Sequence, residues 1–165
     1  MQNQTFTAAD IRARRAETPR PRDRDFAESL GIREAALVAA YCGKGVTRID
    51  AHPDVVMEAA QDLGEVMALT RNASCVHEKV GVYDNYHPGN HAAMILTEDI
   101  DLRIFPSRWQ HAFLVERDGD AGTQRSLQVF DAAGDAVHKI FLRDGSDHNA
   151  FSQMTRTMAS DNQSP

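Results

Sequence analysis

The feature that most constrains the fold is a change in the spacing of apolar residues at Gly64. Before Gly64 the apolar residues recur at helical spacing, and after it they occur in short strand-like segments separated by turns. The links between these segments are short and rich in Pro, Gly and Asp, which indicates antiparallel neighbours, because parallel strands need long crossover connections. The predicted strands cover residues 65–71, 73–84, 92–97, 100–105, 111–117, 124–131 and 136–143.

The first third of the chain is predicted to be helical. Thr7 can cap a helix that runs through Arg15, with Asp10 in its first turn opposing the positive end of the helix. Further helices are expected over residues 23–30, 33–42, 53–62 and, near the end of the chain, 147–158. Helices followed by an antiparallel meander and one returning helix define an α+β fold. We expect a single domain over residues 1–158 and a disordered polar tail over residues 159–165.

Charge and targeting signals narrow the class of protein. The chain has 24 acidic and 18 basic residues and a net charge of −6, which argues against a general binder of nucleic acid or anionic membranes. The segment Met1–Ala9 lacks a signal-peptide pattern, and no apolar run is long enough to span a bilayer. Cys42 and Cys75 form no CxxC pair, so we expect reduced thiols and a cytoplasmic location.

The segment Ala68–Asn85 is unusually polar for two consecutive strands. In the predicted strand 73–84, Cys75, His77 and Lys79 share one face. A neutral imidazole at His77 could be an axial ligand of iron, so His77 is a candidate metal ligand. The alternative is an ordinary surface histidine.

Zinc is a second possibility in this region, because His87 and His91 follow Cys75 and His77. Structural zinc sites need four closely spaced soft ligands on an ordered knuckle or helix. Here the two later histidines flank a Pro-Gly turn, and a second cysteine pair is missing, so the spacing does not favour zinc.

The predicted strand 100–105 carries a second candidate site. Its alternation puts the apolar Ile100, Leu102 and Ile104 on one face, and Asp101, Arg103 and Phe105 on the other. A guanidinium beside a phenyl ring suits a flat, partly apolar, anionic ligand, because the ring can stack while the arginine reaches a carboxylate. The alternative is a solvated arginine opposite an acidic cross-strand partner.

The segment Phe26–Tyr41 is similar to a helix–turn–helix. Helix–Gly–helix corners are also common packing units. The second helix of this segment, residues 34–40, contains no Arg, Asn or Gln to read base edges. A DNA-binding regulator is therefore a minor alternative.

Four motifs in a fixed order resemble the bacterial haemin-degrading, haem-utilisation family of the HemS/HmuS type. The resemblance extends over nearly the whole chain. The motifs are Thr70-Arg71-Asn72 with Val76-His77-Glu78, the turn region 87–96, Asp101-Leu102-Arg103-Ile104-Phe105 followed by Trp109, and the segment 131–139.

The resemblance implies haem (heme) as the cofactor. Members of that family consist of two related halves with haem between them, and this chain resembles the N-terminal half. By that resemblance Arg103 lies on the distal side of the haem beside the aromatic Phe105, and His77 is the counterpart of a secondary haem site. The main axial histidine of the family lies in the second half and has no counterpart here. The resemblance assigns no catalytic residue to this chain.

The leading hypothesis is a cytoplasmic haem-utilisation domain that takes part in the acquisition of haem iron. It would bind haem weakly or as a homodimer, or together with a missing C-terminal half. Whether it carries haem or degrades it in an oxygenase-like reaction stays open. The alternatives are a non-catalytic packing half without a ligand of its own and the helix–turn–helix regulator.

Overall fold

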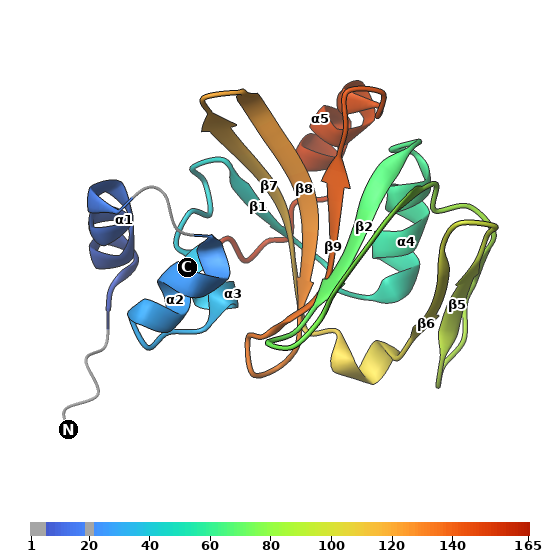
Figure 1. Cartoon of the computed structure of the whole chain (residues 1–165), viewed down its shortest axis with the longest axis horizontal. Helices are drawn as coiled ribbons and strands as arrows, with labels where there is room; N and C mark the ends of the chain where they lie inside the picture. Colours follow the sequence, from blue (N-terminus) through green and yellow to red (C-terminus); the bar gives the residue numbers. More distant parts are fainter. Residues whose placement is uncertain (1–5, 19–21) are drawn as a thin grey trace.

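Two antiparallel sheets organise the chain in the computed structural model, which describes residues 6–18 and 22–165 (Figure 1). The larger sheet has six strands in the order β1-β7-β8-β9-β2-β3, and the smaller has three in the order β4-β5-β6. The larger sheet consists of β1 (Val46–Ile49), β2 (Val66–Arg71), β3 (Val76–Gly81), β7 (His111–Gly119), β8 (Gly122–Phe130) and β9 (Ala136–Leu142). The smaller consists of β4 (Tyr86–His87), β5 (Ala93–Leu96) and β6 (Asp101–Ile104).

Five α-helices accompany the sheets within the described residues. They are α1 (Ala8–Glu17), α2 (Asp23–Ser29), α3 (Glu34–Ala39), α4 (Pro53–Gln61) and α5 (His148–Thr157), with a short 3-10 turn at Pro106–Arg108. Thr7 caps α1 in a reciprocal box, in which the Asp10 backbone N–H donates to the Thr7 hydroxyl and the Asp10 carboxylate accepts from the Thr7 backbone. The helices before and after the two antiparallel sheets confirm the predicted α+β class.

The structure differs from the sequence prediction at several boundaries. The strand expected over residues 73–84 is shorter, because Asn72 accepts from the backbone N–H groups of Ser74 and Cys75 and closes a turn before β3. Strand β1 was not predicted, since its four residues are too few for a recognisable alternation. Strand β4, with only two residues, falls within the region expected to be a turn.

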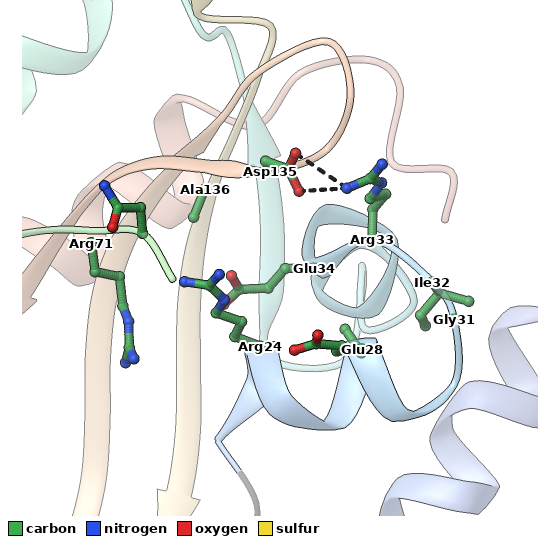
Figure 2. A pocket seen from close by; sticks show the side chains of 11 residues that line it. Arg24, Glu28, Gly31, Ile32, Arg33, Glu34, Arg71, Asp135 and Ala136 are labelled. Carbon is green, nitrogen blue, oxygen red and sulfur yellow. Dashed lines mark hydrogen bonds and ion pairs between the residues drawn. The ribbon is translucent and has the colours of Figure 1, made fainter. Parts of the chain in front are cut away.

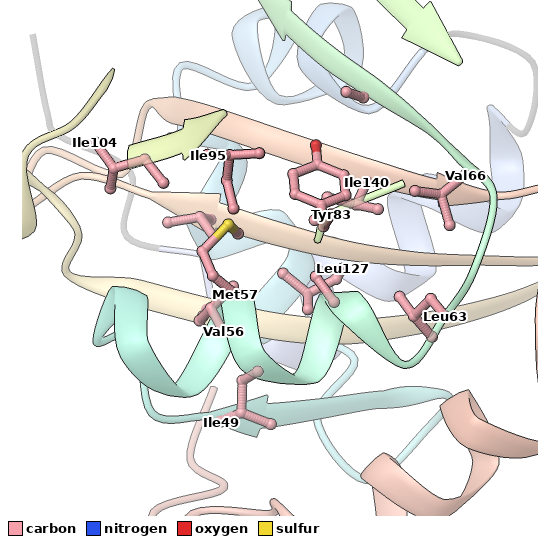
Figure 3. Packing of buried hydrophobic residues seen from close by; sticks show 14 of the residues in the cluster. Ile49, Val56, Met57, Leu63, Val66, Tyr83, Ile95, Ile104, Leu127 and Ile140 are labelled. Atoms are coloured by element: carbon pink, nitrogen blue, oxygen red, sulfur yellow. The ribbon is translucent and has the colours of Figure 1, made fainter. Parts of the chain in front are cut away.

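The main core lies between the large sheet, α4, α5 and the small sheet (Figure 3). Alternate residues of the central strands, such as Leu127 and Ile140, point to this side and are fully buried. Helix α4 contributes Val56 and Met57, and the small sheet contributes Ile95. The small sheet is therefore attached to the rest of the domain through its apolar inner face.

The opposite face of the large sheet is covered only in part. Helix α3 lies against β1 and β7, where Phe113 and Phe130 pack with Val38, and α1 and α2 pack on α3 (Figure 1). Five of the six residues of α3 are buried, so its surface is occupied by packing. This burial favours the packing-unit interpretation of the segment 26–41 over a DNA-reading helix.

The segment after α5 returns to β1. The Arg48 backbone N–H donates to the Gln163 amide oxygen, the Gln163 amide donates back to the Arg48 carbonyl, and Ser160 N–H donates to the same carbonyl. The sequence predicts disorder over residues 159–165 because they are polar. The Gln163 side chain and the Ser160 backbone N–H meet the free edge of β1 at Arg48. Among the described residues, no helix is long and apolar enough to cross a membrane.

Candidate functional site

Arg103 of β6 and Phe105, the extended residue that follows this strand, lie on one exposed face, as the alternation predicts. Ile104 between them is 3% exposed and belongs to the core, whereas Phe105 is 48% exposed. Arg103 Nη1 donates to Asp101 Oδ1 across 2.6 Å, and the arginine side chain is about half exposed. The acidic partner of Arg103 is therefore two positions away on the same strand and not across the sheet.

Two residues beside β6 complete this surface. Met94 of β5 lies directly opposite Arg103 in the antiparallel register, so the two side chains share a face. The ring of His91, just before β5, packs edge-on against Phe105 with centroids 6.2 Å apart. We call His91, Met94, Asp101, Arg103 and Phe105 the β5–β6 patch. The sequence assigned no clear role to His91, and only the ring contact reveals its place.

The chemistry of the β5–β6 patch suits a flat ligand with both apolar and anionic parts. Phe105, His91 and Met94 offer apolar and polarizable surface, and the guanidinium of Arg103 can bind a carboxylate or stack on a ring. Only Nη1 of Arg103 has a hydrogen-bond partner among the described residues, so most of its donors remain available.

His77 lies apart from this patch. It is exposed on β3, an edge strand of the large sheet, and faces Thr70 of β2 in the register. No hydrogen bond or ring contact between described residues joins His77 to Arg103 or Phe105. The three residues singled out from the sequence therefore form two places on the surface and not one site.

A buried group of three hydrogen-bonded side chains, Tyr83, His138 and Thr70, lies beside β3, the strand that carries His77. The hydroxyl of Tyr83 is 2.5 Å from Nε2 of His138, and Nδ1 of His138 is 2.9 Å from the hydroxyl of Thr70. One neutral tautomer of His138 satisfies both contacts, accepting from Tyr83 and donating to Thr70. The alternation of the strand 136–143 does not indicate that Tyr83 and Thr70 meet His138, because these residues are distant in sequence.

Burial determines the protonation states of His138 and Tyr83 in this group. Burial, with a smaller contribution from the nearby His77, lowers the pKa of His138 from 6.5 to about 4. Burial also raises the pKa of the Tyr83 hydroxyl. Both side chains are therefore neutral at neutral pH. Their hydrogen bonds to each other and to Thr70 satisfy the polar groups that are buried in this part of the core.

The structure does not assemble a metal centre from side chains alone. Within residues 6–18 and 22–165, no group of three or more His, Cys, Asp or Glu side chains could hold a metal ion. His87 is exposed on β4, His91 packs on Phe105, and Cys75 is exposed before β3. A metal at His77 would therefore need further ligands from a bound molecule or a partner.

The fold and the β5–β6 patch define a class of protein: an α+β domain of two antiparallel sheets that exposes an arginine and an aromatic ring on the smaller one. Residues 31–158 match the family model of the haemin-degrading HemS/ChuX domain. The chain therefore belongs to this family.

Relatives of known function share the sequence over most of this chain. It is 38% identical over 138 residues to the haemin transport protein HmuS of Yersinia pestis and 36% identical to the haemin transport protein HemS of Yersinia enterocolitica. Each alignment covers 83% of this chain but 40% of the relative. The chain thus spans less than half the length of these relatives.

Solved structures agree in fold. The haem-bound form of PhuS, a haem-binding protein from Pseudomonas aeruginosa, superposes with a TM-score of 0.89 at 36% identity, over 96% of this chain and 48% of PhuS. ChuS, an Escherichia coli haem oxygenase, gives a TM-score of 0.86 at 31% identity, over 94% of this chain and 47% of ChuS. The haem-binding protein ChuX is covered over 97% of its length with a TM-score of 0.78, but at 19% identity it shows the fold alone.

Proposed function

We propose that this chain binds haem on the β5–β6 patch and serves haem-iron acquisition in the cytoplasm, as a single domain over residues 1–158. The observation that carries the proposal is the pair Arg103 and Phe105, side by side on an exposed sheet face with His91 against the ring. The likeness to HmuS, HemS and PhuS supports haem as the ligand.

The residues present fit the chemistry of haem. Phe105 is a half-exposed aromatic side chain on a sheet face, which offers a stacking surface for a planar macrocycle. The free donors of Arg103 can bind a propionate or an iron-bound ligand in bidentate geometry. Haem would supply the iron chemistry, and these side chains would hold and orient it.

The patch leaves one side of such a ligand open. A second surface is therefore needed to enclose it, and either a second copy of this chain or a C-terminal half could supply one. In a homodimer, each Arg103 would face the partner subunit. This chain covers 40% of HmuS and 48% of PhuS, which is why a second surface is proposed.

His77 is the proposed secondary haem ligand. Its exposure on an edge strand leaves the imidazole accessible to iron without rearrangement of the core. Because His77 and the β5–β6 patch lie on different sheets, the two positions predict separable effects on haem binding.

A haem titration tests the proposal. The Soret band is expected to saturate near stoichiometry and to weaken in Arg103→Ala, Phe105→Ala and, for the secondary site, His77→Ala. Arg108→Ala, an exposed arginine in the adjacent 3-10 turn, is the matched control and should leave the titration unchanged. A spectral change no larger than that given by an unrelated protein would overturn the proposal.

Haem degradation is tested separately from haem carriage. Adding ascorbate to the haem complex and following absorbance distinguishes conversion to verdohaem or biliverdin from a stable complex. Either result is compatible with haem-iron acquisition, and the result decides between an oxygenase-like reaction and haem transfer.

A second candidate function is a packing half without its own ligand. The exposed apolar residues Phe105, 48% exposed, and Val76, 49% exposed, favour this candidate, because both would be covered by another domain. It predicts no Soret change, and a loss of exposed apolar surface when the other half is present.

A further inference from the structure

The partly open face of the large sheet holds a cavity on the side away from α4 and the small sheet. Its volume is about 410 Å³, and it is bounded by residues of helices α1, α2 and α3 and of strands β2, β7, β8 and β9. A second pocket on the same side shares Arg24, Glu34 and Arg71 with it (Figure 2). Figure 1 places α2 and the small sheet on opposite sides of the large sheet, so this cavity is separate from the β5–β6 patch.

Positive charge is concentrated around this cavity. Six cationic side chains line it against only two carboxylates, Asp23 and Glu34, although the chain as a whole has a net charge of −6. The cationic residues are Arg15, Arg22, Arg24, Arg71, Arg117 and Lys139. A cavity with an excess of one sign of charge and low-dielectric walls concentrates ligands of the opposite sign.

Both carboxylates are already occupied by part of this set. Asp23 Oδ1 accepts from Arg117 Nη1 at 2.5 Å and from Arg15 Nη2 at 3.2 Å. Glu34 accepts from Lys139 in a buried ion pair. Arg22, Arg24 and Arg71 form no ion pair within the described part of the chain, so their charges are available to a ligand.

Polar atoms in the wall of the cavity lack partners. Gln128 is 4% exposed, its amide nitrogen donates to the Ser126 hydroxyl at 3.0 Å, and its amide oxygen has no partner among the described residues. Nε of Arg71 and Nη2 of Arg117 are also buried and have no hydrogen-bond partner among the described residues. Buried polar groups are normally hydrogen-bonded, so these atoms can take hydrogen-bond partners from a molecule bound in the cavity.

The Gln128–Ser126 pair can present donors as well as an acceptor. Rotating the amide exchanges its oxygen and nitrogen, and the Ser126 hydroxyl can donate to the oxygen instead of accepting from the nitrogen. The amide NH₂ of Gln128 would then point to the ligand, alongside the guanidinium groups of Arg71 and Arg117. Such a set of donors matches several anionic oxygens at once.

We infer that this cavity binds a small multivalent anion bearing phosphate or carboxylate groups. Its volume lies within the range of small-molecule sites. A nucleic-acid backbone is a poorer fit, because Gln128 and Ser126 are almost fully buried in the sheet and a duplex cannot reach them.

Calorimetric titration with pyrophosphate and with citrate, at constant ionic strength, tests the inference. Saturable one-to-one binding of either anion is expected, and the anion that binds identifies phosphate or carboxylate as the recognised group. Arg71→Gln and Gln128→Leu should each weaken binding about tenfold, which is about 1.4 kcal/mol. Arg156→Gln, an exposed arginine of α5, is the control and should leave binding unchanged.

Three results would overturn the inference. They are binding of neither anion, equal binding in all variants, and tighter binding of duplex DNA that the same two substitutions abolish. Circular dichroism of each variant shows whether it is folded. Arg71→Gln removes no hydrogen bond or ion pair between described residues, so it keeps the test valid if Gln128→Leu unfolds. Haem titration of the same variants should be unaffected, so failure here is distinct from failure of the haem proposal.

Discussion

The hydroxyl of Tyr83 meets Nε2 of His138 at 2.5 Å inside the core, and both residues are at least 95% buried. The contact joins the segment after β3 to β9 across the side of the sheet that faces α4. Thr70 extends it from Nδ1 of His138 toward the surface. The pair satisfies two polar groups that would otherwise destabilise the core.

Stability should fall with acid because of His138. Its folded-state pKa of about 4 lies below its ordinary value of 6.5, so the unfolded chain takes up the proton first. The contribution is fully present above about pH 6.5 and is lost as the pH falls toward 4, with about 2 kcal/mol lost between pH 7 and pH 5.

Urea unfolding of wild type and His138→Gln at these two pH values measures this contribution. The variant should be less stable at pH 7 but should lose about 2 kcal/mol less on acidification. His87→Gln, an exposed histidine of β4, should retain the wild-type difference. An unchanged pH dependence in His138→Gln would contradict the assignment.

The buried ion pair of Glu34 and Lys139 should tolerate the loss of one partner poorly. Their side chains are 9% and 10% exposed, so Glu34→Ala leaves a buried, unpaired ammonium. We expect a loss of about 3–5 kcal/mol in the free energy of unfolding. Arg33→Ala breaks the exposed pair with Asp135 and should cost under about 1 kcal/mol in the same denaturation experiment.

Helix α4 provides a matched test of core packing. Met57 is fully buried, and Met57→Ala should lower the free energy of unfolding by about 2–5 kcal/mol because it leaves a cavity. Val55 of the same helix is 37% exposed, and Val55→Ala should change stability by less than about 0.5 kcal/mol. Equal effects in chemical denaturation would show that α4 is not packed as described.

Asp101 should weaken the binding of an anionic ligand at Arg103. Its carboxylate lies 2.6 Å from Arg103 Nη1 and is exposed, so it neutralises part of the charge that the ligand meets. Asp101→Asn should tighten haem binding about two- to threefold in the Soret titration, and the gain should shrink at high salt. Asp144→Asn, in an exposed turn, should have no effect, and weaker binding by Asp101→Asn would show that the carboxylate positions the arginine instead.

Much of the fold followed from local patterns along the chain. The change of period at Gly64 and the short links predicted the antiparallel sheets, and Thr7 with Asp10 predicted the capped first helix. The patterns failed where an element was too short to show a period, as in the four-residue strand β1. Alternation in strand 100–105 also predicted correctly that Arg103 and Phe105 share an exposed face.

The change from helical to strand-like spacing at Gly64 thus determined the fold class, because the periodicity of apolar residues is a local property of the chain. Only the tertiary structure decided that His77 stands apart from Arg103, that His91 packs on Phe105, and that Tyr83 meets His138. It also gathered arginines from α1, α2, β2 and β7 around one cavity. These contacts join residues distant in sequence, and their formation depends on strand order and sheet packing, which no local pattern specifies.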